Sequence, residues 1–145
     1  MSDMLRIAKA DITTAKLLSH HYGDEVFLNI AGYHCSQAAE KLVKSYIISK
    51  GVIPLKTHKI FELINYIQHR GIYNIMLDKI SDYALKIDAW YSETRYTICY
   101  LATKEDIVET LDILGHLSEK MSEVTYDNVS GIKHEVTRHS KRTKK

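Results

Sequence analysis

Three polar side chains lie one helical turn apart in a helix-forming stretch of this 145-residue chain. Ser36, Glu40 and Lys44 share one face at i, i+4 spacing. Glu40 before Lys44 is the favourable order for an ion pair, which contributes about 0.2–0.5 kcal/mol when exposed. Ser36 has no evident base nearby, which argues against nucleophilic catalysis. The spacing is compatible with a solvated ion pair and with part of a binding site.

The histidines do not have the spacing of a metal site. His20 and His21 are adjacent and diverge on a helix, whereas three others are isolated on separate elements, namely His34, His69 and His116. The sequence contains no His-Glu-x-x-His motif, no Cys-x-x-Cys motif and no glycine-rich phosphate loop. We therefore expect no metal and no cofactor.

Five segments have apolar residues at helical spacing, which favours an all-α, antiparallel up-down bundle of four to five helices. Asp24, Thr57 and Thr103 are the expected N-caps of three of these helices, and Gly51 is the expected stop of the long second one. The expected helices cover about 2–20, 24–50, 57–69, 74–90 and 103–121, with an irregular segment at 91–102.

The long second helix is expected to be the central one. Its middle, Cys35-Ser36-Gln37-Ala38-Ala39, consists mainly of small side chains, and its apolar residues cover a wide arc. Small residues let neighbouring helix backbones approach closely. This helix is therefore expected to contact several others at once.

Length and charge indicate one domain, residues 1–123, and a basic, flexible tail, residues 124–145. The tail has six Lys or Arg residues against two acidic ones, so it either contacts RNA or another acidic surface or is merely solvated. No apolar run approaches the roughly 18 residues of a membrane span, and the start lacks a signal-peptide core. Cys35 and Cys99 are expected to be free thiols in a reducing cytoplasm.

Three segments follow one another along the chain: SQAAEKLVK at residues 36–44, Thr57-His58, and Thr94-Arg95-Tyr96. Together, in this order, they resemble the HEPN family (higher eukaryotes and prokaryotes nucleotide-binding domains). The resemblance spans about residues 5–120. It implies a four- or five-helix bundle, commonly a homodimer, with a role near nucleotides or RNA. Many members are encoded beside a minimal nucleotidyltransferase in toxin–antitoxin pairs.

The chain departs from the ribonuclease members of that family, which carry an arginine followed, after four to six residues, by a histidine. In them arginine steadies phosphate charge while histidine moves a proton to or from the 2′-hydroxyl. No histidine follows Arg95 through Thr103, and Tyr100 stands at that spacing. A phenol, with a usual pKa of about 10, carries protons poorly at neutral pH. We therefore expect no catalytic residues.

The retained residues suggest a phosphate site at one rim of the bundle. In this hypothesis Arg95 is a forked donor, Lys44 is a point charge, and the amides at Thr57-His58 open a helix toward the anion. Arg95 reaches back to Glu40. In the competing hypothesis, an Arg95–Glu40 pair is a structural lock that fastens a loop to the core, and both readings stay open.

Tyrosines surround Arg95 in the sequence, at positions 91, 96 and 100. Aromatic rings beside a basic group can stack a base, and tyrosines also line helix ends and dimer seams. Tyr96 is therefore a further candidate for nucleotide binding. In some family pairs the partner transferase nucleotidylates a tyrosine near the Arg–His motif, which makes Tyr96 and Tyr100 candidates for modification.

The sequence thus predicts a cytoplasmic, dimeric binding module, non-catalytic or weakly catalytic, for a nucleotide, RNA or a partner nucleotidyltransferase. One alternative is an RNA-cleaving toxin with a divergent, metal-independent site. The other is a helical interaction bundle without a small ligand.

Overall fold

The computed structural model describes residues 2–21, 24–96 and 102–139, and the side chains of 2–20, 24–91 and 102–123. All regular structure in these ranges is helical. The elements, in chain order, are α1 (Asp3–His21), α2 (Glu25–Ser49), α3 (Ile60–His69), the 3₁₀ turn η1 (Ile75–Leu77), α4 (Asp78–Asp82), α5 (Ala84–Tyr96) and α6 (Lys104–His139). The expected all-α bundle is confirmed.

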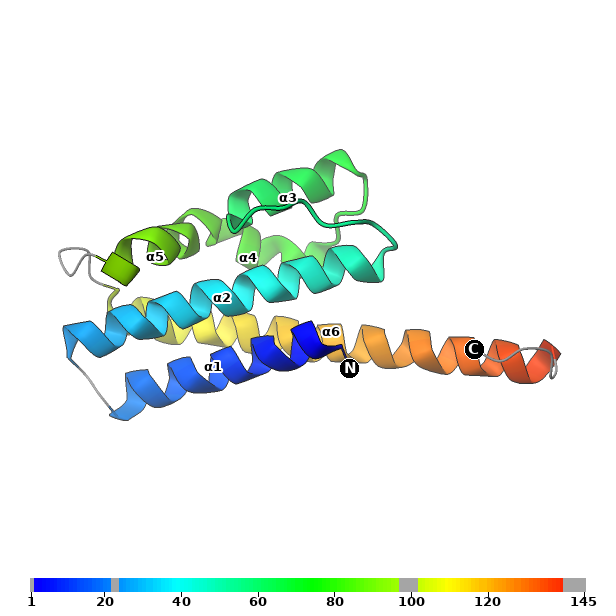
Figure 1. Cartoon of the computed structure of the whole chain (residues 1–145), viewed down its shortest axis with the longest axis horizontal. Helices are drawn as coiled ribbons and strands as arrows, with labels where there is room; N and C mark the ends of the chain where they lie inside the picture. The colour runs from blue at the N-terminus through cyan, green and yellow to red at the C-terminus, as the bar shows by residue number, and fades with distance from the viewer. Residues whose placement is uncertain (1, 22–23, 97–101, 140–145) are drawn as a thin grey trace.

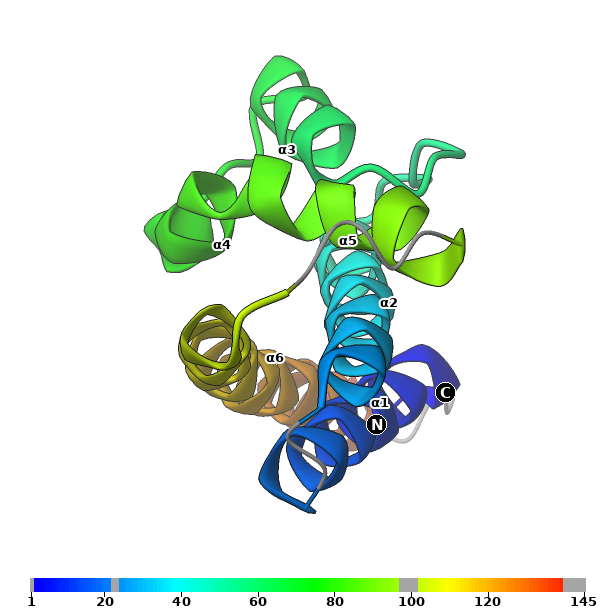
Figure 2. The ribbon, with the colours of Figure 1, turned by 90° about the vertical axis from the view of Figure 1, so that its left-hand side faces the viewer.

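Helix α2 lies at the centre of the bundle, with α1 and α6 on one side and α3, α4 and α5 on the other (Figures 1 and 2). Its small residues Ala31, Cys35, Ala38 and Ala39 are completely buried. A Cβ added at Gly32 would lie 3.2 Å from the Trp90 ring, so the absence of a side chain there lets α5 approach α2 closely. The thin middle of α2 is thus what allows several helices to meet on it.

The predicted ends of α2 are confirmed. The Asp24 carboxylate accepts hydrogen bonds from the amides of Val26 (2.9 Å) and Phe27 (3.2 Å), which satisfies two donors at the helix start. Gly51, just past the other end, has φ of 76°, in the left-handed region that glycine adopts at little cost.

The predicted cap of the last helix is also present. The amide of Asp106 donates to the Thr103 hydroxyl at 3.1 Å. The Asp106 carboxylate does not complete a capping box, because it accepts from Lys86 of α5 at 2.9 Å instead. This contact ties α6 to α5.

The fourth predicted helix, at 74–90, is wrong in its bounds. The Asn74 side chain caps only the short turn η1, and the chain then forms α4 and, after a break at Tyr83, α5. Helix α5 continues to Tyr96, into the segment expected to be irregular. Helical spacing persists across the break, which is why the pattern alone did not reveal it.

The start of α3 differs from the prediction as well. The helix begins at Ile60 rather than after Thr57, and its first amides donate to the Asp88 carboxylate of α5. Because the connection at 50–59 leads back along α2, α3 runs in the same direction as α2 (Figure 1). The helices α1, α2, α5 and α6 alternate in direction, as expected for an up-down bundle.

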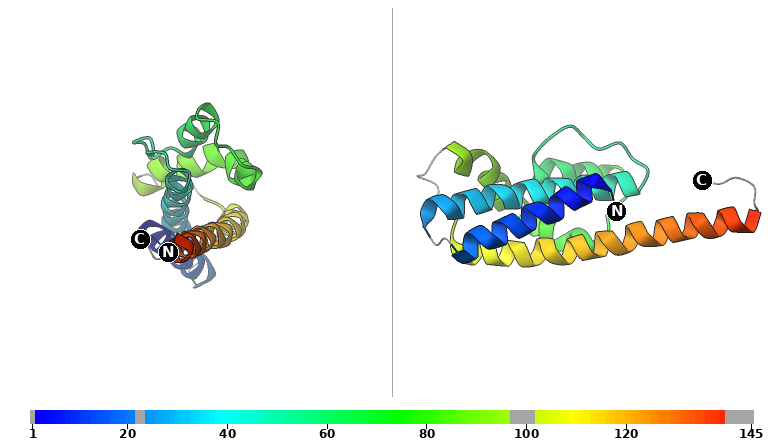
Figure 3. Two further views of the ribbon diagram at one scale, coloured as in Figure 1. Left: turned by 90° about the vertical axis from the view of Figure 1, so that its right-hand side faces the viewer. Right: turned by 60° about the horizontal axis from the view of Figure 1, so that its bottom comes forward.

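Helix α6 is longer than expected and continues to His139, inside the segment assigned to a tail. Figure 3 shows it extending beyond the ends of the other helices. Met121, near the end of the bundle, is the last core residue among the described side chains.

Candidate functional site

Glu40 is the centre of a polar cluster on α2. Its carboxylate accepts from Lys44 Nζ at 2.9 Å, and both of its oxygens lie near His58 Nδ1, at 3.1 and 3.2 Å. The side chain of Glu40 is only 12% exposed, whereas that of His58 is 59% exposed. We call Glu40, Lys44 and His58 the Glu40 cluster. It joins α2 to the connection that precedes α3.

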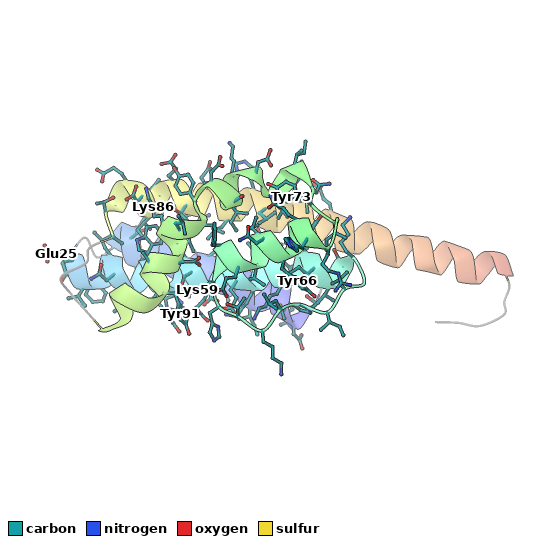
Figure 4. The ribbon with its side chains drawn as sticks, turned by 90° about the horizontal axis from the view of Figure 1, so that it is seen from above. Glu25, Lys59, Tyr66, Tyr73, Lys86 and Tyr91 are labelled. Carbon is teal, nitrogen blue, oxygen red and sulfur yellow. The ribbon has the colours of Figure 1, made fainter. Side chains whose placement is uncertain are left out.

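Aromatic rings continue from this cluster across α5 and α2. The His58 ring is stacked on Tyr91, with centroids 5.0 Å apart and planes at 18°. Tyr91, labelled in Figure 4, stacks in turn on Tyr33, with ring centroids 6.0 Å apart. The rings of Tyr33 and His34 form a T-shaped pair, also with centroids 6.0 Å apart. We call Tyr33 and Tyr91 the tyrosine stack. Both are partly exposed.

A second polar cluster lies at the other end of the tyrosine stack. Asp11 of α1 accepts from Lys41 Nζ at 3.1 Å, and its other oxygen lies 3.0 Å from His34 Nδ1. Burial raises the pKa of the Asp11 carboxyl, but the hydrogen bonds from His34 and Lys41 outweigh burial, and the net pKa is lowered. We call Asp11, His34 and Lys41 the Asp11 cluster, and the two clusters with the tyrosine stack form the polar strip.

The amide site predicted at the start of α3 is not open. The backbone N–H groups of Ile60 and Phe61 donate to the Asp88 carboxylate at 2.6 and 3.0 Å. Thr57 accepts from the amide of Lys59 at 3.2 Å. A phosphate would have to displace Asp88 to reach the first α3 amides, so these amides do not support the phosphate hypothesis.

In a comparison with known protein families, the HEPN domain family model matches residues 1–124. The chain belongs to the HEPN domain family. No curated protein and no solved structure matches it. Membership supports a nucleotide- or RNA-related module at the level of the family.

The site residues predicted for this HEPN domain fall into two groups, those whose side chains the structure describes and those outside the described residues. Glu40, Lys44 and His58, which were expected beside Arg95, come together. The side chains of Arg95 and Tyr96, and the whole of Tyr100, lie outside the described residues. The backbone of α5 places position 95 four residues after Tyr91, one helical turn beyond the tyrosine stack.

Sequence reasoning missed the Asp11 cluster and the role of Tyr33. His34 was considered only as an isolated histidine, and its partner Asp11 lies on another helix. The one local signal was the spacing of Gln37 and Lys41, four residues apart, and the Lys41 ammonium group donates to the Gln37 amide oxygen at 3.2 Å. That spacing marks a helix face but does not reveal which helix packs against it.

Other surface features of the described chain lie apart from the polar strip. A groove of about 460 Å³ runs between α1 and α6 and includes Lys16, Gly115 and His116, and another of about 290 Å³ lies between α6 and the η1–α4 segment. Neither is lined by a residue of the polar strip.

Among the described side chains no group of three His, Cys, Asp or Glu residues could hold a metal ion. No helix in the described ranges is long and apolar enough to span a bilayer.

Proposed function

We propose that this HEPN domain binds a nucleotide or RNA on the polar strip, with Glu40, Lys44, His58, Arg95 and Tyr96 at the binding end. The observation that supports this most directly is the convergence at Glu40. Lys44 from α2 and His58 from the connection before α3 both contact its carboxylate, and Tyr91 of α5 stacks on His58. Three segments far apart in the chain thus supply charge, hydrogen-bonding groups and an aromatic surface at one place.

Each group has a separate part in binding. The exposed His58 ring, fixed by its stacking on Tyr91, offers a surface on which a base stacks, a contact worth about 1–3 kcal/mol per base. Lys44 is neutralised by Glu40 in the free protein, so an incoming phosphate competes with that carboxylate for its ammonium group. In this proposal Arg95 supplies a second positive charge for the ligand. Affinity therefore depends on both stacking and charge.

Binding is tested with fluorescein-labelled single-stranded RNA and with nucleotides, by fluorescence anisotropy. We expect Tyr91→Ala and Lys44→Ala each to weaken binding by roughly fivefold or more, since stacking or charge is lost. Lys86→Ala is the matched control, because Lys86 makes an ion pair of the same 2.9 Å length with Asp106, away from the polar strip. Binding that is absent in the wild type, or equal in all variants, would contradict the proposal.

Arg95→Ala separates the two roles considered for Arg95. If Arg95 contacts the ligand, the variant binds more weakly and keeps its melting temperature. If Arg95 is a structural lock on Glu40, the melting temperature falls while binding is unchanged, because removing one partner leaves a charge uncompensated.

The proposal extends to partners. We propose that the domain is a homodimer and pairs with a minimal nucleotidyltransferase in a toxin–antitoxin-like unit, in which Tyr96 and Tyr100 are the candidates for nucleotidylation. Family membership and the tyrosine-rich end of α5 support this pairing. Co-expression with such a transferase, followed by light scattering and intact-mass measurement, tests it. No complex and no mass increase would count against it.

One observation favours a second candidate, the divergent metal-independent ribonuclease. His58 Nδ1 lies against a carboxylate, an arrangement that orients an imidazole for proton transfer. Incubating labelled RNA with the protein in the presence of a metal chelator tests this function. Cleavage that is lost in both His58→Ala and Arg95→Ala would establish it over pure binding.

A further inference from the structure

Two histidines of the polar strip are held in the same way. His58 Nδ1 lies 3.1 Å from Glu40, and His34 Nδ1 lies 3.0 Å from Asp11. An ionised carboxylate only accepts hydrogen bonds, so the proton of each contact is on Nδ1. In the neutral imidazole the other nitrogen, Nε2, then has no proton and is an acceptor.

Both carboxylates are themselves fixed. Glu40 is 12% exposed and accepts from Lys44, and Asp11 is 15% exposed and accepts from Lys41. Each lysine holds its carboxylate in place beside the imidazole, so each histidine is held with its proton on Nδ1. The stacking of His58 on Tyr91 further fixes the plane of its ring. Among the described side chains no hydrogen bond occupies Nε2 of His58 or of His34.

An acceptor nitrogen on a protein surface that binds nucleic acid favours ligands with a hydrogen-bond donor. Phosphate oxygens are acceptors and do not pair with a bare Nε2, whereas the ribose 2′-hydroxyl donates a hydrogen bond and is the group that distinguishes RNA from DNA. His58 is the better placed of the two, since its side chain is 59% exposed compared with 29% for His34.

We infer that His58 accepts a hydrogen bond from a ribose 2′-hydroxyl, so that the polar strip selects RNA or ribonucleotides over their deoxy counterparts. This inference rests on the proposed function of the same surface. It makes Glu40 a positioning residue, which acts by keeping the proton on Nδ1 of His58. Lys44 acts one step further away by holding Glu40.

The test compares three single strands of one sequence by fluorescence anisotropy: RNA, DNA and 2′-O-methyl RNA. The methylated strand keeps an oxygen at the 2′ position but has lost the hydroxyl proton, so it isolates the donor. One hydrogen bond corresponds to a roughly fivefold to tenfold difference in affinity. We expect RNA to bind more tightly than both other strands by about this factor.

Three variants locate the effect. His58→Phe keeps an aromatic ring to stack on Tyr91 but removes the acceptor, so it should bind all three strands equally, at about the affinity of the wild type for DNA. In Glu40→Gln the side-chain amide can donate to Nδ1 of His58, so the proton is no longer held on that nitrogen. This variant should therefore reduce the preference for RNA, and it tests the inference even if His58→Phe does not fold. His116→Phe is the control, because His116 of α6 is 74% exposed, lies apart from the polar strip, and makes its hydrogen bond among the described residues to Asp112 of the same helix.

The outcomes separate the two proposals. If the wild type binds all three strands equally well, the 2′-hydroxyl inference is overturned and the proposed function stands. The inference is also overturned if His58→Phe keeps the full preference for RNA, or if it weakens RNA and DNA by the same factor, as loss of a phosphate contact would. If no strand and no nucleotide binds, the proposed function itself fails.

Discussion

Asp11 accepts hydrogen bonds from two side chains of α2, and so its charge helps to hold α1 against α2. Its pKa is lowered in the folded protein, because the contacts with His34 and Lys41 outweigh the effect of burial. An acid whose folded pKa is lowered stabilises the fold above its ordinary pKa, here 3.8, and this stabilisation is lost as the pH falls through the folded pKa.

We therefore predict that Asp11→Asn lowers the free energy of unfolding by about 1–2 kcal/mol at neutral pH, because two charge-assisted hydrogen bonds are weakened. Below the ordinary pKa the difference from wild type shrinks. Urea denaturation at a series of pH values measures both effects. Asp3→Asn is the control on the same helix, since Asp3 is 92% exposed. A difference that stays constant with pH would refute the role given to the Asp11 charge.

At the level of single residues, the sequence predicted part of the candidate site. Glu40 and Lys44 are one helical turn apart, so their contact follows from helix geometry alone. His58 was placed near them through the family resemblance. Asp11, Tyr33 and His34 were not found, because their contacts depend on how α1 and α5 are rotated against α2, which periodicity does not determine.

The start of α3 depends on another helix. Thr57 was the expected cap from its residue type, but the donors of Ile60 and Phe61 are satisfied by Asp88, which lies in α5. Burial raises the pKa of Asp88, and the hydrogen bonds from the two amides offset this only in part. The carboxylate therefore carries a desolvation cost while it fastens α3 to α5.

We predict that Asp88→Ala reduces the free energy of unfolding by about 1–2 kcal/mol, the usual cost of losing a cap. Asp88→Asn should cost less, because it keeps an acceptor and removes the buried charge. Urea denaturation at neutral pH measures both, with Asp112→Ala as the control at an acidic residue that is 72% exposed. Equal losses for Ala and Asn at position 88 would show that the amide contacts do not carry the effect.

Helix ends were predicted well where the signal is local and poorly where it is not. Asp24, Gly51 and Thr103 act on neighbouring residues, and each lies where the sequence placed it. The break at Tyr83 and the cap from Asp88 arise from packing between helices, which a single sequence does not display.

For the whole molecule, the family match and the described core end close together, at residues 124 and 121, whereas α6 continues to His139. The segment 124–145 carries six Lys or Arg residues and two acidic ones, so its removal changes the net charge from +2 to −2. The helical order of the bundle was predictable from the periodicity, but the length of α6 and the direction of α3 were not.

We predict that a chain ending at Glu123 unfolds with a free energy within about 0.5 kcal/mol of the full chain, as for changes outside a packed core. Its affinity for RNA should fall and become less dependent on salt, because fewer basic groups contact phosphates. Urea denaturation and anisotropy titrations at several salt concentrations test the two statements. A large loss of stability would show that the segment belongs to the folded unit.

The chain contains a single tryptophan, Trp90, which is buried over Gly32 and directly precedes Tyr91 of the tyrosine stack. Its intrinsic fluorescence therefore comes from one known point, the junction of α2 and α5. Any occupant of the aromatic surface that shifts α5 against α2 changes the surroundings of that indole, so the molecule contains its own optical reporter and needs no attached dye.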